Sequence, residues 1–301
     1  MAYLGLNRFS DAKAIRNKEL AANLGLHWTH IDLYGIAVVE NDAAAMQQEI
    51  GWAKGNTYEF FMLEIVAGVE AAAGKLQKAR ETYRQAMESA RRGEFDGIAR
   101  NMAVDLDLVE TELGNASQTS RAPSAVPNSE HARKAAAHIF AMTGDLGRAG
   151  ALAAELLKDA PTDTYVNNVW VPSIRAEIEV SRGDPAKAIE LLKATSLYEF
   201  GWKAHGWPSY VRGRAYLRAQ KGKEAAAEFQ KILDHRGVCL ADSLATVFYA
   251  LSHLQLARGR AMSGDAAGAR TAYQDFFNLW KDADSDIPIL KQAKAEYAKL
   301  Q

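Results

Sequence analysis

The segment Gly144-Asp145-Leu146-Gly147-Arg148-Ala149, followed later by Pro161, decides the fold. Glycine tolerates the left-handed backbone of a tight turn between two helices, so Gly144 marks such a turn. Ala149 falls just inside the second helix, where the two backbones approach most closely and only a small side chain fits. Pro161 cannot continue a helix and ends the unit. The segment therefore predicts two antiparallel helices that pack together.

The same combination of a turn residue and a residue five positions later recurs along the chain. The pairs are Asn7–Ala12, Asn41–Met46, Gly74–Ala79, Gly114–Thr119, Gly144–Ala149, Gly183–Ala188, Gln220–Ala225 and Gly264–Ala269. The pairs with Met46 and Thr119 are the weaker ones, and Gln220 fits only if glutamine takes the turn. The spacing of the turns scatters around the ~34-residue period of tetratricopeptide repeats. Large side chains four residues after the small position complete an apolar stripe, as at Tyr83 and Phe229.

This period predicts an all-α fold, a right-handed α-α superhelix of about eight helix pairs with a C-terminal capping helix. We expect a single domain over 1–301. The expected units cover 1–24, 27–54, 57–92, a fourth from 94 onward, 129–160, 163–195, 207–235 and 243–280, and the cap covers 288–300. Pro123 and Pro127 interrupt the second helix of the fourth unit, so a weak joint is predicted at 117–128.

The composition supports a helical protein and excludes several classes. Of 301 residues, 48% are hydrophobic and only 7 are proline, which favours helix. The 36 basic and 37 acidic residues nearly cancel, which argues against non-specific nucleic-acid binding. No apolar run has the ~20 residues of a membrane span, and the first residues lack a secretory pattern. We therefore expect a cytoplasmic protein, or a periplasmic one if a parent chain places it beyond a membrane helix.

Three segments carry a resemblance to a known family: Ala2 to Ile15, Glu228 to Gly237 and Leu279 to Leu290. With them, the chain resembles the tetratricopeptide region that follows the kinase domain in large bacterial serine/threonine protein kinases, particularly acidobacterial ones. Similar regions follow winged-helix transcription regulators, so the upstream partner stays open. The chain departs from the pattern at 117–128. Tyr3 fills a late position of a repeat's first helix, so we expect either a piece of a longer protein or a frayed capping helix.

The resemblance implies a protein-interaction scaffold, the recruitment or sensory region of a bacterial signalling protein. A second hypothesis is an oligomerisation or autoinhibitory module that binds its own parent chain, and homo-oligomers are compatible with either. A third is an enzyme on a helical-repeat fold, which would need paired carboxylates in a cleft. No such pair is evident from spacing, so we expect no catalysis by this chain even if its parent is a kinase.

Motifs for cofactors and metals are also missing, and we expect neither. The single Cys239 excludes an internal disulfide and a cysteine zinc cluster. Asp282, Asp284 and Asp286 have the spacing that begins a calcium loop, but the glycine and the final glutamate are absent, and capping of the next helix explains them better. The pairs His27–His30 and His131–His138 lack a third ligand.

In tetratricopeptide superhelices the first helix of each pair lines the concave face, where ligands bind. Counting back from each turn gives candidate binding residues: Trp28, Phe61, His138, Trp170, Trp207, Tyr210, Arg214, Arg218 and Arg258. Aromatic residues with arginine are typical interface hot spots, although an aromatic at helical spacing is also typical of a core. The arginines predict an acidic peptide or a C-terminal carboxylate as partner. The aromatic segment 197–207 is either a recognition loop or a packed connection.

Overall fold

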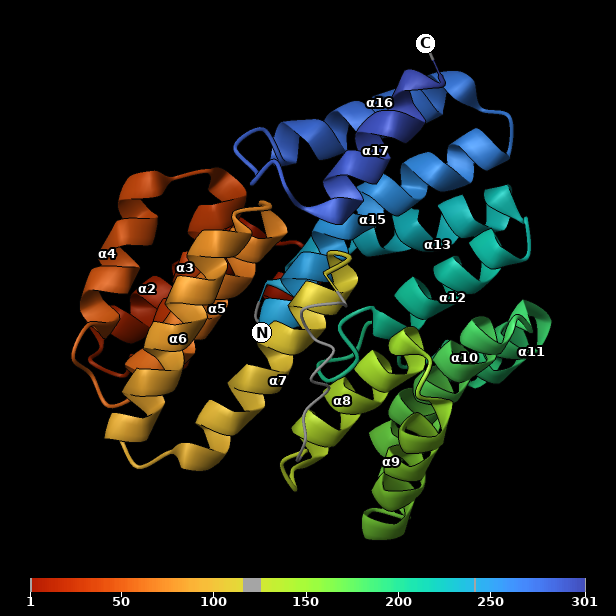
Figure 1. Ribbon diagram of the computed structural model, residues 1–301. Helices are drawn as coiled ribbons and strands as arrows, with labels where there is room; N and C mark the ends of the chain where they lie inside the picture. Colours follow the sequence, from red (N-terminus) through yellow and green to blue (C-terminus); the bar gives the residue numbers. More distant parts are fainter. Residues whose placement is uncertain (1, 116–125, 241, 301) are drawn as a thin grey trace.

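The computed structural model describes residues 2–115, 126–240 and 242–300, and every regular element in these ranges is a helix (Figure 1). The first half contains α1 (Ala2–Gly5), α2 (Phe9–Ala21), α3 (His27–Glu40), α4 (Ala43–Ala53), α5 (Glu59–Ala72), α6 (Leu76–Arg92) and α7 (Asp96–Glu112). Then follow α8 (Glu130–Thr143), α9 (Leu146–Asp159), the π-helical turn η1 (Val166–Trp170), α10 (Val171–Arg182), α11 (Pro185–Leu191) and the 3-10 turn η2 (Leu192–Thr195). The last part contains α12 (Trp207–Arg218), α13 (Gly222–Asp234), α14 (Arg236–Cys239), α15 (Ser243–Met262), α16 (Ala266–Leu279) and α17 (Pro288–Ala298). The prediction of an all-α fold is confirmed.

The predicted turn residues have the left-handed backbone of a tight turn. All eight have positive φ, from 55° at Asn41 to 91° at Gly144, and Gln220 also takes the left-handed conformation, at 59°. Such a conformation costs little for glycine and is tolerated by asparagine. The glutamine shows that tertiary packing imposes the turn even where the residue type does not favour it.

The small residues after the turns are buried between the paired helices. Ala79, Ala149, Ala188, Ala225 and Ala269 are completely buried, and Ala12 is nearly so. Met46 is half-buried, and Thr119 lies outside the described residues. Tyr83, Leu192, Phe229 and Tyr273, the large side chains of the stripe, are buried as well. The close approach of two helices therefore dictates a methyl-sized side chain at this position.

Helices far apart in the sequence also pack against each other. α15 packs on α5 and α7, although it also packs on its chain neighbours α13 and α16 (Figure 1). Gly68 of α5 lies against Ser243, the first residue of α15. Beyond it, the Trp280 indole N–H donates to the Ala72 carbonyl at 2.8 Å. A second long-range contact joins α1 to α14: the Asn7 side-chain amide donates to the Asp234 carbonyl, and its side-chain oxygen accepts from the Gly237 N–H.

Three features differ from expectation or lie beyond it. α14 was not predicted, and the proposed joint at 117–128 falls mostly outside the described residues. Asp284 does cap a helix, but not the one that follows it: its carboxylate accepts from the Gln77 N–H at 2.8 Å, at the start of α6. Sequence proximity suggested the wrong partner because the start of α6 lies next to this loop in the fold.

No described helix has both the length and the apolar character needed to cross a bilayer.

Candidate functional site

Three neighbouring pockets contain eight of the nine candidate binding residues. The acidic pocket, of about 260 Å³, is lined by Trp28, Phe61, Glu64, Asp105, His131 and Asp242 among others. The central cavity, of about 30 Å³, is lined by Lys134, His138, Trp170, Lys203, His205, Trp207, Asp242 and apolar residues. The arginine pocket, of about 360 Å³, is lined by Glu112, Arg214, Arg218, Gln255, Arg258 and others. Asp242 borders the first two pockets, so they adjoin.

The acidic pocket holds a pair of interacting carboxyl groups. Asp105 of α7 binds the His131 ring of α8 at 2.7 Å, and its negative charge, outweighing burial, raises the pKa of His131. Glu64 of α5 lines the same pocket as Asp105. Burial and the negative charges of Asp105 and Asp242 raise the pKa of Glu64 well above its ordinary value. Trp28 and Phe61 are the aromatic neighbours of these two carboxyl groups in the pocket.

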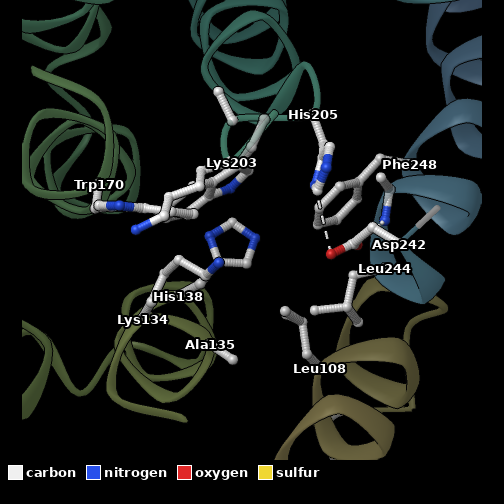
Figure 2. Close-up of a pocket in the computed structure, with 13 residues that line it drawn as sticks. Leu108, Lys134, Ala135, His138, Trp170, Lys203, His205, Asp242, Leu244 and Phe248 are labelled. Atoms are coloured by element: carbon white, nitrogen blue, oxygen red, sulfur yellow. Dashed lines mark hydrogen bonds and ion pairs between the residues drawn. The ribbon is translucent and has the colours of Figure 1, made fainter. Parts of the chain in front are cut away.

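Figure 2 shows the central cavity, where side chains from several elements converge. Lys134 and His138 come from one face of α8, and Trp170 comes from the π-helical turn that precedes α10. His205 enters from the segment before α12, and Asp242 from the residue that caps α15. The π-helical turn widens the helix by one residue and thereby changes the direction of the side chains that follow.

Two histidines of the central cavity are each held by a carboxylate. The Nε2 atom of His138 is 2.8 Å from Glu112, and the Nδ1 atom of His205 is 3.4 Å from Asp242. Burial alone would raise the pKa of Glu112, but the charge of Arg214 and the bond from His138 lower it. Glu112 is thus ionised and accepts the His138 Nε2–H. The remaining ring nitrogens, Nδ1 of His138 and Nε2 of His205, are buried and have no hydrogen-bond partner within the described ranges.

Lys134 and Asp242 carry the main charges of this cavity. The Lys134 Nζ lies 3.5 Å from the centre of the Trp170 ring, a cation–π contact. Burial lowers the pKa of Lys134 to about 8. Burial would raise the pKa of Asp242, but the charges of His205 and Lys134 and the Ala245 N–H lower it well below its ordinary value. Asp242 is therefore a fixed anion that is already engaged by His205 and the start of α15.

The arginine pocket brings together the three arginines that the sequence placed on one face. Arg214 is 3.0 Å from Glu177 and 3.4 Å from Glu112. Arg258 makes two bonds to Glu296 of α17, at 2.9 and 3.0 Å. Arg218 is exposed and pairs with no described acidic residue. Only Arg218 therefore has its full hydrogen-bonding capacity free for a ligand.

The aromatic candidates divide between exposed and buried positions. Trp28 is 41% exposed and Phe61 is half-buried, so both are accessible from the acidic pocket. His138, Trp170, Trp207 and Tyr210 are buried. Tyr210 lines none of the three pockets; its hydroxyl donates to Glu112 at 3.1 Å, and its ring stacks on Phe248 of the central cavity. A contact of Tyr210 with a peptide on the surface is incompatible with this burial.

The segment 197–207 is in part a packed connection and in part exposed. Phe200 stacks on His235 with 4.0 Å between ring centres, so part of the segment is a packed connection. Lys203, Ala204 and His205 line the central cavity. Leu197 and Trp202 are exposed. The segment thus forms one wall of the cavity and also presents apolar side chains to solvent.

Sequence reasoning missed Glu64, Asp105, Lys134, His205 and Asp242. Two signals were present: Glu64 is a charged residue inside the apolar run Phe60 to Val69, and Lys134 lies one helical turn before His138.

In the part of the chain that the structure describes, no three His, Cys, Asp or Glu side chains are placed to hold a metal ion. No family model and no curated protein matches this chain.

Proposed function

We propose that this chain is a protein-interaction scaffold, a tetratricopeptide-type superhelix that serves as the recruitment or sensory region of a bacterial signalling protein, such as a serine/threonine kinase. The observation that carries the proposal is the agreement between the eight left-handed turns and the buried alanines that follow most of them. We expect such packing in a tetratricopeptide unit, whose repeat is two helices joined by a turn. Proteins built from such units bind other proteins along their inner face.

The arginine pocket is the surface that we assign to the partner. It is large enough for a side chain or a chain terminus, and its exposed Arg218 pairs with no acidic residue in the described part of the chain. A guanidinium binds a carboxylate through two parallel hydrogen bonds. The partner is therefore an acidic peptide segment or a C-terminal carboxylate, and its affinity decreases with added salt.

Fluorescence polarisation with acidic peptides tests this assignment. Arg218→Ala should weaken an acidic peptide at least tenfold, whereas Arg175→Ala, which removes another exposed arginine outside the three pockets, should not. The same peptide with a C-terminal amide, and one with its acidic residues changed to amides, separates the two carboxylate sources. Equal affinity of both variants and the wild type would exclude this pocket.

A parent chain is the alternative partner. A module that binds its own kinase domain, or a sensor region of a winged-helix regulator, would use the same pocket for an internal segment. Pull-down of acidic segments with and without the kinase domain separates these cases, because an internal ligand competes with an added one. Sedimentation of the purified chain over a range of concentrations tests homo-oligomerisation.

One observation favours a second candidate function, acid–base catalysis. Glu64, whose pKa is raised by burial and by nearby negative charges, lies with Asp105 in a pocket beside two aromatic rings. A carboxyl group with a raised pKa next to a second carboxyl group can perform general acid and base steps. Hydrolysis of chromogenic glycosides and esters by the wild type, lost in Glu64→Gln and in Asp105→Asn, would establish it. Activity that survives both substitutions would come from another source.

A further inference from the structure

A further pocket, of about 250 Å³, is lined by residues of both α5 and α15, and we call it the α5–α15 pocket. It shares no lining residue with the acidic pocket, the central cavity or the arginine pocket. Most of its lining is apolar: Val38, Met46, Val69, Ala72, Ala73, Cys239, Leu240, Ala250 and Leu279. A pocket with an apolar body and few polar groups is typical of a small-molecule site.

The size of the α5–α15 pocket exceeds that of a packing defect. Protein interiors contain few voids larger than a water molecule, whereas the small side chains of Ala72, Ala73 and Ala250 leave this space open. Met46, which takes the position where the other described units have alanine, also lines it. A water molecule occupies about 30 Å³ in the liquid, and a methylene group is similar in size. The pocket therefore has room for a chain of about eight carbon atoms.

Arg236, the first residue of α14, supplies the charge of this pocket. It is half-buried, its guanidinium lies 5.5 Å from the centre of the Tyr249 ring, and its side chain forms no ion pair or hydrogen bond with any described residue. None of the lining residues is acidic. The Thr246 hydroxyl already donates to the Cys239 carbonyl, and burial raises the pKa of the Cys239 thiol to about 12, so the thiol is neutral. The pocket therefore combines an apolar body with one uncompensated cation.

We propose that the α5–α15 pocket binds a medium-chain fatty carboxylate, with the carboxylate on Arg236 and the alkyl chain against the apolar lining. A guanidinium holds a carboxylate through two parallel hydrogen bonds. An anionic membrane surface attracts clusters of basic residues, whereas Arg236 is the single basic residue among those that line this pocket. The site does not depend on the proposed peptide binding at the arginine pocket. Because the ligand would contact both α5 and α15, it would stabilise their packing.

Octanoate is the probe that tests the proposal. Isothermal titration calorimetry should give a Kd on the order of 0.1 mM, in the range for a ligand of about ten non-hydrogen atoms. Octanamide, of the same length without the charge, should bind at least tenfold more weakly. Butyrate, which keeps the charge and lacks four methylene groups, should bind at least fiftyfold more weakly, since each buried methylene group contributes a factor of about four.

Three results would overturn the proposal. Equal affinity for octanamide would mean that Arg236 does not bind the carboxylate, and equal affinity for butyrate would mean that the pocket does not hold the alkyl chain. Absence of octanoate binding would leave the pocket without its ligand. In that last case, cosedimentation with phosphatidylglycerol vesicles would assign this face to a membrane surface instead.

Substitutions of Arg236 locate the binding. Arg236→Met removes the charge and should weaken octanoate at least tenfold, whereas Arg236→Lys keeps a cation and should retain most of the affinity. Arg175→Met, the same change at an exposed arginine of α10 that does not line the pocket, should leave the Kd unchanged. If Arg236→Met does not fold, Ala73→Leu takes up part of the pocket from a half-buried position and should weaken octanoate at least fivefold. Octanoate affinity equal to that of the wild type in a folded Arg236→Met or Ala73→Leu protein contradicts the site.

Discussion

Gly68→Ala tests whether α15 closes against α5 as described. A Cβ atom at this position would lie 2.6 Å from the Ser243 Cα and 2.7 Å from its carbonyl oxygen. The shortest of these distances is about 0.8 Å less than the 3.4 Å at which ordinary van der Waals contact begins. Because the opposing atoms include backbone, they cannot move aside by changing a rotamer. The two helices must separate, or α15 must shift.

Two energies of opposite sign decide the outcome. Overpacking a close contact costs about 1–3 kcal/mol, whereas replacing a helical glycine by alanine gains about 1 kcal/mol. With a rigid backbone as the obstacle, we expect the upper part of the first range and a net loss of about 1–2 kcal/mol. Stability would be measured by urea denaturation followed by circular dichroism, provided the slope of the transition is unchanged.

Gly51→Ala is the matched control. Gly51 is an exposed glycine inside α4, and a Cβ there would meet no atom within 4 Å. The same substitution should therefore stabilise the protein by about 0.5–1 kcal/mol, through the unfolded chain and helix propensity alone. Opposite shifts of the two midpoints support the closure. If Gly68→Ala raises the midpoint as Gly51→Ala does, α5 and α15 are not in contact as described.

Three further predictions concern packing, ion pairs and protonation. Ala149→Leu should lower stability by about 1–3 kcal/mol in chemical denaturation, while Ala151→Leu on the exposed side of α9 should have little effect; equal midpoints would refute the repeat register. Arg214→Ala should cost about 3–5 kcal/mol, because it leaves Glu177 and Glu112 buried without their cation; a loss under about 1 kcal/mol would mean that the pair is solvated. Glu64 has a raised pKa in the folded protein, so its contribution to stability falls as the pH rises above the ordinary glutamate value of ~4.3. Glu64→Gln, which resembles the protonated acid, should flatten the stability–pH curve between pH 4 and 7, and a curve parallel to that of the wild type would show that Glu64 is ionised.

The units of the fold were predictable because local rules fix them. A left-handed turn residue and a small residue five positions later act within one helix pair, so one sequence displays both. Even Gln220 could be placed, because its neighbours kept the period. The closure was not predictable, since Gly68 and Ser243 are ordinary residues in their own segments and only their contact is informative.

The candidate site was predictable in its helix faces but not in its partners. Counting back from the turns gave Trp28, His138 and Arg218, which line pockets, because residues at helical spacing share one face of a helix. The acidic residues that form ion pairs with Arg214 and Arg258 could not be found in this way. Glu112 meets Arg214 across 102 positions of sequence. Neither residue has a local sequence pattern that indicates this contact. The burial and the ion pairs of the candidate residues could therefore be seen only in the structure.

The bonds between Asn7 and Gly237 also bear on the speed of folding. The two residues are separated by 230 positions, and Trp280 bonds to Ala72 across 208. Helical proteins usually fold quickly because their contacts are local. Here the helix pairs can form early and independently, but these long-range contacts must wait until both of their partners have been synthesised. During synthesis the faces of α5 and α7 that contact α15 stay uncovered until α15 leaves the ribosome. A chaperone would bind in this interval.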